Sequence, residues 1–183
     1  MTEYTETSSS PESTTHASAH DRDLSGVLLR NPQRADAYGI HALIQQCPPL
    51  DLNSVYTYLL LSEHFSDTCL IASRAGQIDG YVSAYFPPRT PDVLFVWQVA
   101  VHERARGTGL GSHLLRSLLA GSSAKRARYV ETTVGPDNAP SRNMFLSLAR
   151  RLGAPVHESL LFDRSLFGPA AHDDERLIRI GPF

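Results

Sequence analysis

The chain has 183 residues, of which 42% are hydrophobic and 20% are charged, and its formal net charge is −2. This length and composition are typical of one soluble globular domain. The slightly negative charge argues against a general binder of nucleic acid or of an acidic membrane surface. The sequence has neither an apolar run of about 18 residues nor the apolar core of a signal peptide, so we expect a cytoplasmic protein that spans no membrane.

Residues 1–23 are dominated by Ser, Thr, acidic residues and His, with almost no aliphatic side chain. Such a segment cannot bury enough apolar surface to offset the entropy of ordering, so we expect a disordered tail before a domain of residues 24–183. Cys47 and Cys69 lie in apolar surroundings without CxxC spacing and are expected to be buried, reduced thiols. The histidines of the domain have no HxxxH or HxH spacing, so we expect no metal site.

Within the domain, β-branched and aromatic runs alternate with segments of helical apolar spacing. Strands are predicted at residues 26–30, 68–74, 78–86, 93–101, 129–134, 156–162 and 176–180. Helices are predicted at residues 35–46, 54–64, 110–120 and 140–152, with Asn53 as the N-cap of the second and Gly153 as the C-terminal cap of the last. This order predicts an α+β domain with one mixed sheet.

A basic, glycine-rich loop, RARGTGLG at residues 104–111, joins an apolar strand to the third predicted helix. Backbone N–H groups and the positive end of the helix dipole meet at such a junction, which is a device for binding phosphate. A P-loop is excluded because the chain contains no Gly-Lys-Ser/Thr, and a dinucleotide GxGxxG is excluded because the third glycine comes too early. The remaining hypothesis is that successive backbone amides of the loop bind a pyrophosphate.

The stretch 104–109 resembles the [Q/R]-x-x-G-x-[G/A] loop of the GCN5-related N-acetyltransferases (the GNAT family). The resemblance implies a GNAT fold, a mixed and mostly antiparallel sheet flanked by helices, with acetyl-CoA as co-substrate. It also implies a bulge in the strand at residues 97–102, whose backbone splays away from the strand at residues 129–134. Unpaired N–H and C=O groups would then face the acetyl-CoA site.

The same resemblance assigns cofactor contacts to the backbone of Val99 and Val101, with the N–H of Val99 or a neighbour facing the acetyl oxygen. The pyrophosphate would lie on the loop formed by Arg104, Arg106, Gly107, Thr108, Gly109 and Gly111. Asn138 resembles the asparagine that touches the pantetheine arm, although a plain turn residue is an equal alternative. Phe145 stands where many members carry a tyrosine acid, so the thiolate leaves unprotonated or takes its proton from water or another side chain.

Three further stretches resemble the L-2,4-diaminobutyrate acetyltransferases of ectoine biosynthesis: CPPLDLNS at residues 47–54, PDVLFVWQVAVH at 91–102 and ETTVGPDN at 131–138. This resemblance implies acetylation of the γ-amine of L-2,4-diaminobutyrate for synthesis of a compatible solute, and a homodimer. Two alternatives stay open. The acceptor can be another small amine or a polyamine, or the chain can be a non-catalytic CoA-binding domain.

A diamine acceptor requires carboxylates or carbonyls in its pocket. Asp51 is a candidate for holding one ammonium group, with capping of the next helix as the alternative. Trp97 is a candidate pocket wall or a core aromatic, and Tyr56 a candidate pocket residue or a packing residue.

The attacking amine must lose a proton, so the reaction needs a base. Glu175 is the preferred candidate and Glu131 the second. Asp173 and Asp174 beside Glu175 would help to attract a dication.

Overall fold

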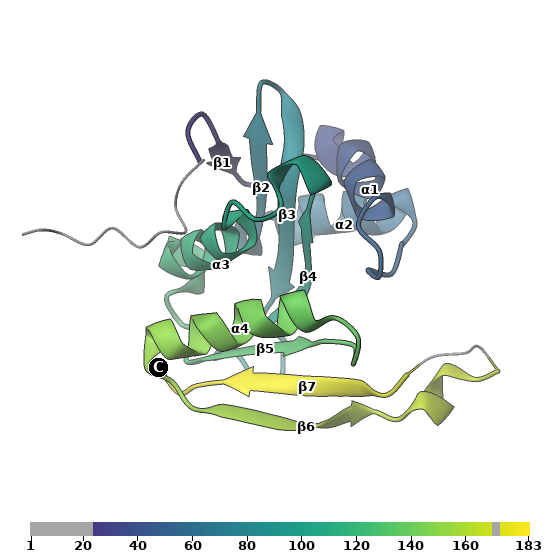
Figure 1. The fold of residues 1–183 in the computed structure, drawn as a ribbon, viewed down its shortest axis with the longest axis vertical. Helices are drawn as coiled ribbons and strands as arrows, with labels where there is room; N and C mark the ends of the chain where they lie inside the picture. The colour runs from purple at the N-terminus through teal and green to yellow at the C-terminus, as the bar shows by residue number, and fades with distance from the viewer. Residues whose placement is uncertain (1–23, 170–172) are drawn as a thin grey trace, which may run out of the picture.

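The computed structural model describes residues 24–169 and 173–183 (Figure 1). The expected tail at residues 1–23 lies outside the described residues. The described residues form seven strands: β1 (Leu28–Arg30), β2 (Cys69–Arg74), β3 (Gln77–Tyr85), β4 (Val93–Val101), β5 (Tyr129–Thr133), β6 (Val156–Phe162) and β7 (Glu175–Ile180). The same part of the chain contains four α-helices: α1 (Ala37–Gln45), α2 (Val55–His64), α3 (Leu110–Ala120) and α4 (Ala139–Leu152).

All seven strands form one sheet in the order β1-β2-β3-β4-β5-β7-β6. β4 and β5 pair in parallel, with α3 as the crossover between them, and the other neighbours are antiparallel. The predicted mixed, mostly antiparallel sheet flanked by helices is therefore confirmed. None of the helices in the described part of the chain is long and apolar enough to cross a membrane.

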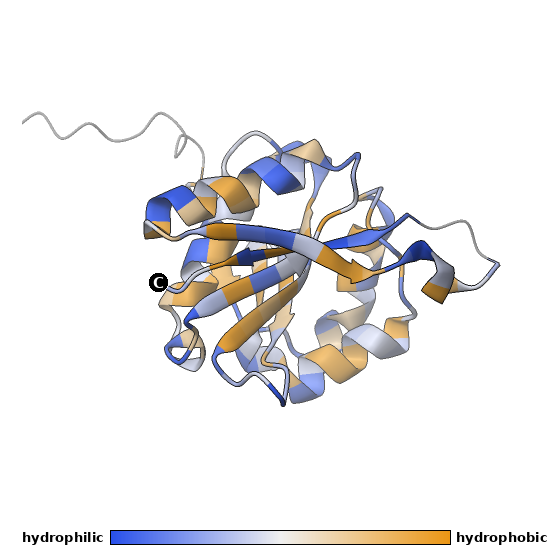
Figure 2. Ribbon diagram, turned by 90° about the horizontal axis from the view of Figure 1, so that it is seen from below, coloured by the Kyte–Doolittle hydropathy of each residue, from blue (hydrophilic) through white to orange (hydrophobic). Residues whose placement is uncertain are grey.

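The two faces of the sheet are covered by different helices, because side chains alternate between faces along each strand. On β3, Val82 and Ala84 pack with the buried leucines of α3 and with Phe145 and Leu148 of α4. Tyr81 points the other way and packs with α1 and α2. Hydrophobic residues accordingly run along the strands in the middle of the molecule (Figure 2).

A bulge interrupts this alternation in β4. Ser83 of β3 pairs with Gln98 but the next residue, Ala84, pairs with Val96, so Trp97 is an extra residue in β4. Before the bulge Leu94 and Val96 pack in the core under α3 and α4. After it the odd-numbered residues, Val99 and Val101, pack there instead.

Local capping departs from the sequence prediction at one helix. Asn53 was predicted to be the N-cap of α2, and this is wrong: Ser54 takes that position, in extended backbone at φ −65° and ψ 156°. Gly153 does end α4 in left-handed backbone at φ 61°, as predicted. Cys47 and Cys69 are buried free thiols, also as predicted.

Candidate active site

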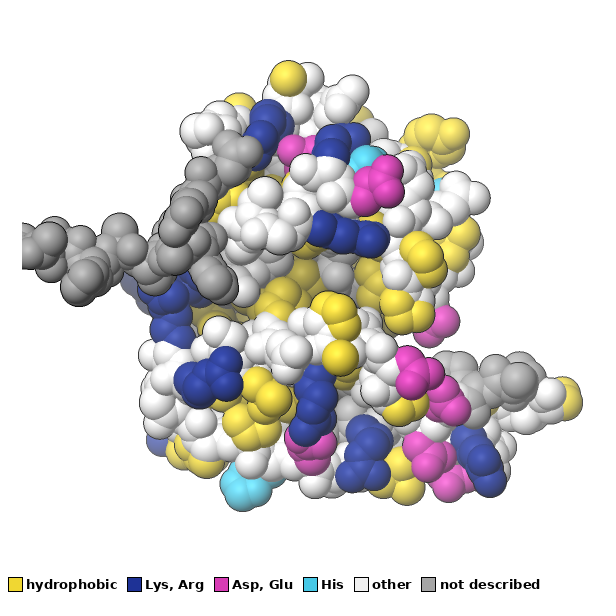
Figure 3. Space-filling view, in the orientation of Figure 1, with side chains coloured by type: hydrophobic (Ala, Val, Ile, Leu, Met, Phe, Trp, Pro, Cys, Tyr) yellow, Lys and Arg dark blue, Asp and Glu magenta, His cyan; other side chains and the backbone are white. Residues whose placement is uncertain are grey.

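Two adjoining cavities, each of about 750 Å³, open where β4 and β5 separate. Parallel pairing of these strands ends at Phe95 and Glu131, so the following backbone of β4 pairs with no strand on the β5 side among the described residues. The residues shared by both cavities are Pro49, Leu50, Val99, Asp137, Asn138 and Ser141. Figure 3 shows the molecule hollowed between α4 and the part of the chain above it, with hydrophobic side chains inside the hollow.

The first of these cavities, which we call the cofactor cavity, contains the exposed backbone edge of β4. The N–H of His102 donates to Asp79 O of β3 at 2.9 Å. Because successive residues of a strand turn their backbone groups to opposite sides, Val99 and Val101 direct theirs away from β3. The carbonyl of Val101 accepts from Arg106 Nε at 3.1 Å, which places that guanidinium at the cavity edge.

The glycine-rich loop closes one end of the cofactor cavity. Gly107 and Gly109 adopt left-handed backbone, at φ 78° and 85°, and α3 begins immediately afterwards at Leu110. The first-turn N–H groups of a helix have no carbonyl partner within the helix, so they are available to an anion at this end. A Cβ on Gly111 would lie 2.9 Å from Met144 Sδ, which explains why α3 and α4 can approach so closely there.

Two loop residues lie differently from their predicted roles. Arg104 is not among the described residues that line the cofactor cavity, since its Nε donates to Asp79 Oδ1 at 2.5 Å and its N–H to His102 Nδ1 at 3.2 Å. Thr108 donates its hydroxyl to Ala105 O at 2.8 Å. The N–H groups that remain for a pyrophosphate thus begin at about Gly107 rather than at Arg104.

Asn138 lies at the junction of the two cavities and caps α4. Its Oδ1 accepts from Ser141 N at 3.1 Å, and its own N–H donates to Gly135 O at 3.1 Å. The turn-residue interpretation of Asn138 therefore holds, and the same residue still lines both cavities. Phe145, on the following turns of α4, is buried at 2% exposure and lines the second cavity.

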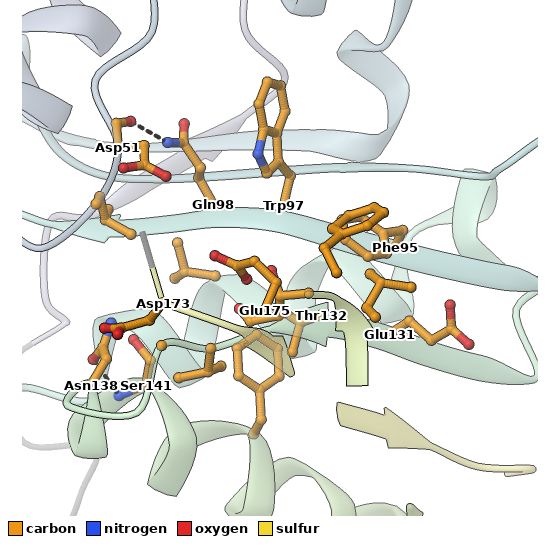
Figure 4. A pocket seen from close by; sticks show the side chains of 18 of the residues that line it. Asp51, Phe95, Trp97, Gln98, Glu131, Thr132, Asn138, Ser141, Asp173 and Glu175 are labelled. Atoms are coloured by element: carbon orange, nitrogen blue, oxygen red, sulfur yellow. Dashed lines mark hydrogen bonds between the residues drawn. The ribbon is translucent and has the colours of Figure 1, made fainter. Parts of the chain in front are cut away.

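The second cavity, which we call the acceptor cavity, has aromatic walls (Figure 4). Trp97, the bulged residue, is 38% exposed and lines it together with Phe95 and Tyr85. Burial raises the pKa of the Tyr85 hydroxyl, so this group stays protonated. Tyr56 is 67% exposed and lines neither cavity, so neither of its two expected roles, in the pocket or in packing, gains support.

Carboxylates gather around the acceptor cavity from four parts of the chain. They are Asp51, Glu131, Asp137, Asp173, Asp174 and Glu175. Glu175 points into the cavity beside Thr132, whereas the carboxylate of Glu131 points away (Figure 4). Glu131 Oε1 accepts from Arg179 Nη1 at 2.5 Å, so an ion pair occupies it. Among the described residues, no group of three His, Cys, Asp or Glu side chains is arranged to hold a metal ion.

Gln98 is a site residue that the sequence reasoning missed. It lines the acceptor cavity, is only 4% exposed, and donates Nε2 to the backbone O of Asp51 at 2.8 Å. A polar side chain inside the apolar run VLFVWQVAV was the available signal. Asp51 itself lies in the cavity wall, and the N-cap of α2 is Ser54, which leaves the capping interpretation of Asp51 without support.

Comparisons with known proteins agree with this geometry. A family model described as the acetyltransferase (GNAT) family matches residues 37–149. An L-2,4-diaminobutyric acid acetyltransferase of Bordetella parapertussis is 58% identical over 156 residues, which are 85% of this chain and 84% of that protein. The protein of the same name from Halomonas elongata is 43% identical over 162 residues, 88% of this chain and 84% of that protein.

Solved structures also resemble this fold. Diaminobutyrate acetyltransferase EctA of Paenibacillus lautus, in complex with L-2,4-diaminobutyric acid and coenzyme A, superimposes with a TM-score of 0.83. It is 39% identical, and the match covers 85% of this chain and 95% of that one. Ard1 of Thermoplasma volcanium, at 17% identity and a TM-score of 0.68, shares the fold, with 85% of this chain and 98% of that one covered.

Proposed function

Because the chain belongs to the acetyltransferase (GNAT) family, we propose that it transfers the acetyl group of acetyl-CoA to the γ-amino group of L-2,4-diaminobutyrate. The product is N-γ-acetyl-L-2,4-diaminobutyrate. One observation carries the proposal: an anion-binding cavity and a carboxylate-rich cavity meet at Val99, where the edge of β4 is exposed. The likeness to diaminobutyrate acetyltransferases over most of both chains supports the acceptor.

The cofactor cavity fits the pyrophosphate and pantetheine parts of coenzyme A. The N–H groups from Gly107 to Gly111 and the guanidinium of Arg106 supply positive charge at one end. The outward backbone groups of Val99 and Val101 supply donors and acceptors for amides along the cavity, and Asn138 lies at its far end. Acetyl-CoA supplies the acetyl group as an activated thioester.

The acceptor cavity fits a small dication. Asp51 on one wall and Glu175 on the other present carboxylates that attract ammonium groups, and Asp173 and Asp174 add to the negative potential. Trp97 provides an apolar wall between them. A cavity with this charge selects an acceptor with two amines over a monoamine.

The chain's own residues account for the proton transfer. Glu175 points into the acceptor cavity and takes the proton from the γ-ammonium group, directly or through water. The N–H of Val99 stabilises the negative charge that develops on the acetyl oxygen. Phe145 has no hydroxyl to donate, so the thiol leaves as thiolate or is protonated through water.

We propose that this reaction is a step of ectoine biosynthesis and takes place in the cytoplasm. We also propose that the active protein is a homodimer. The sheet edge formed by β6 supports self-association. Leu160 and Phe162 on this edge strand are 51% and 46% exposed, and a second copy would cover them. Sedimentation equilibrium of the full chain tests this, with a single species of one-chain mass as the contradicting result.

Thiol release from acetyl-CoA tests the activity. With L-2,4-diaminobutyrate we expect stoichiometric free thiol, and NMR of the product should show acetylation at the γ-nitrogen. Ornithine and spermidine in parallel identify the acceptor class, because faster turnover on either would replace diaminobutyrate in the proposal. Tight CoA binding with no thiol release on any of these amines would mean that the chain is a CoA-binding domain without transferase activity.

A further inference from the structure

Gln98 is a buried polar residue that the proposed chemistry does not use. Its side chain is 4% exposed within a strand that is otherwise apolar. A buried amide is costly unless its donors and acceptor are hydrogen-bonded, so its partners must be accounted for.

The bulge at Trp97 determines where this side chain points. Val96 before the bulge and Val99 after it both pack in the core under α3 and α4. Gln98, which lies between Trp97 and Val99, therefore turns to the opposite face, the one covered by α1 and α2. Without the extra residue, position 98 would share the face of Val96 and could not reach the acceptor loop at residues 47–54.

On that face Gln98 takes part in a directional chain of hydrogen bonds. Its Nε2 donates to the backbone O of Asp51 at 2.8 Å, and its Oε1 accepts from Tyr58 Oη at 3.4 Å. Tyr58 Oη in turn accepts from the N–H of Asn53 at 3.4 Å. Since a carbonyl can only accept, the Asp51 contact fixes which end of the amide faces the loop. The loop is thereby held on both sides of Leu52.

We propose that Gln98 is a positioning residue for the acceptor, acting through Asp51; this inference rests on the proposed function. Gln98 fixes the backbone of Asp51 against the bulged strand, next to Trp97, so that the Asp51 carboxylate keeps its place in the cavity wall (Figure 4). The bulge thus lies where the two cavities meet, because the edge of β4 that follows it lines the cofactor cavity.

The contact between Gln98 and Asp51 is made at the acceptor end of the loop. The loop at residues 47–54 lines both cavities, with residues 47–50 in the wall of the cofactor cavity and Asp51 in the wall of the acceptor cavity alone. Gln98 holds this loop at Asp51, and among the hydrogen bonds of the described residues it has none to the glycine-rich loop. Loss of the contact should therefore weaken acceptor binding much more than cofactor binding.

The variant Gln98→Met, which keeps the size and removes both side-chain hydrogen bonds, tests this. We expect the KM for diaminobutyrate to rise about 10-fold, the KM for acetyl-CoA to stay within twofold, and kcat to fall less than the KM rises. Gln98→Leu is a second variant, since it also removes both side-chain hydrogen bonds but has a different shape, so an effect common to both variants reflects the lost hydrogen bonds.

Ser83→Ala is the matched control. Ser83 Oγ accepts from the backbone N–H of Gln98 at 3.2 Å, on the side of β3, so this variant disturbs the same buried residue without touching the acceptor loop. It should lower the free energy of unfolding and leave both KM values unchanged. An equal rise of the diaminobutyrate KM in Ser83→Ala would overturn the positioning role and leave general destabilisation as the cause.

A double-mutant cycle tests whether the effect passes through Asp51. In the Asp51→Asn background, Gln98→Met should change the diaminobutyrate KM less than about twofold, because the carboxylate it positions is already gone. Full additivity overturns the inference, as does a wild-type KM in either folded Gln98 variant. A wild-type protein that fails to acetylate diaminobutyrate would instead overturn the proposed function.

Discussion

The Nε of Arg104 lies 2.5 Å from Oδ1 of Asp79, a carboxylate whose side chain is only 4% exposed. Arg104 Nη2 also donates to Ile78 O at 3.0 Å. This ion pair ties the beginning of the glycine-rich loop to β3 and directs the guanidinium away from the cofactor cavity. Of the two arginines in the loop, Arg104 therefore stabilises the loop and Arg106 is the one that lines the cavity.

Arg104→Ala should lower the free energy of unfolding by about 2 kcal/mol, because it leaves a buried carboxylate whose other cation, Arg74 Nε, is 3.7 Å away. A less firmly held loop should also raise the KM for acetyl-CoA several-fold. Urea unfolding and initial-rate kinetics measure the two effects. Arg106→Ala is the control: it should raise the same KM while changing the unfolding free energy by less than about 0.5 kcal/mol. Unchanged stability in Arg104→Ala would contradict the anchoring role.

Gly109→Ala should destabilise the fold by about 1–2 kcal/mol, because Gly109 has φ 85°, where a side chain is strained. Relief of that strain would move the start of α3 and raise the KM for acetyl-CoA. Gly153→Ala introduces comparable strain, at φ 61°, at the distant end of α4. Gly153→Ala should lower the free energy of unfolding by a similar amount without affecting the KM for acetyl-CoA. Thermal unfolding with kinetics separates the two variants, and an equal KM effect in both would refute the local explanation.

The sequence predicted the parts of this site that depend on local spacing. Alternating and helical periodicities predicted the strands and helices to within one or two residues, and they predicted that the glycine-rich loop lies between a strand and the start of a helix. Which of Arg104 and Arg106 faces the cavity depends on Asp79, 25 residues earlier in the chain, and no local pattern encodes that.

The other features of the site depend on the register of the sheet. The pairing of Glu131 with Arg179 follows from the alignment of β5 with β7, and the direction of Gln98 follows from one extra residue at Trp97. A one-residue shift reverses the face on which every later side chain lies, so such features need the three-dimensional pairing.

The free energy of unfolding should depend on pH in the acid range, through the carboxylate of Asp36. Its carboxylate accepts from Arg30 Nη1 and Nη2, each at 2.6 Å, and from Gln33 N at 2.7 Å. The hydrogen bonds from Arg30 hold the pKa of Asp36 below its usual value of 3.8 in the folded state. This contribution is complete above the unfolded pKa and is lost as the pH falls through the folded pKa.

Asp36→Asn should therefore be less stable than wild type above about pH 5, by less than about 1 kcal/mol since Arg30 is largely exposed. The difference should shrink as the pH falls below the usual value of 3.8. Urea unfolding at several pH values measures it. A difference in unfolding free energy that grows as the pH falls would contradict the stabilising role of the Asp36 carboxylate.

Cys69 should resist alkylation in the folded protein. Burial raises the pKa of the Cys69 thiol to about 11, so that roughly one molecule in a thousand is thiolate at about pH 8. We expect iodoacetamide to modify this residue more than about 100-fold faster in urea than under native conditions, as followed by mass spectrometry of the peptide. Native labelling at the rate of the unfolded chain would contradict the burial of this thiol.

The two candidate bases should differ in their effect on kcat. Glu175→Gln removes the carboxylate that points into the acceptor cavity, so kcat should fall by about 10²-fold or more and the acid limb of the pH–rate profile should disappear. Glu131→Gln should lower kcat less than about 10-fold, because the Glu131 carboxylate is already paired with Arg179. The main effect of this variant should be a lower free energy of unfolding, since the Arg179 guanidinium loses its carboxylate partner.

Asp173→Asn is the control for charge alone. It should reduce kcat/KM for the diamine modestly, in a manner that weakens with added salt, and should leave the pH profile intact. If Glu131→Gln abolished the acid limb and Glu175→Gln retained it, the base would be Glu131, and its ion pair with Arg179 would have to open during turnover. If both variants kept the profile, neither carboxylate would be the base, and another carboxylate of the acceptor cavity or a water molecule would have to take the proton.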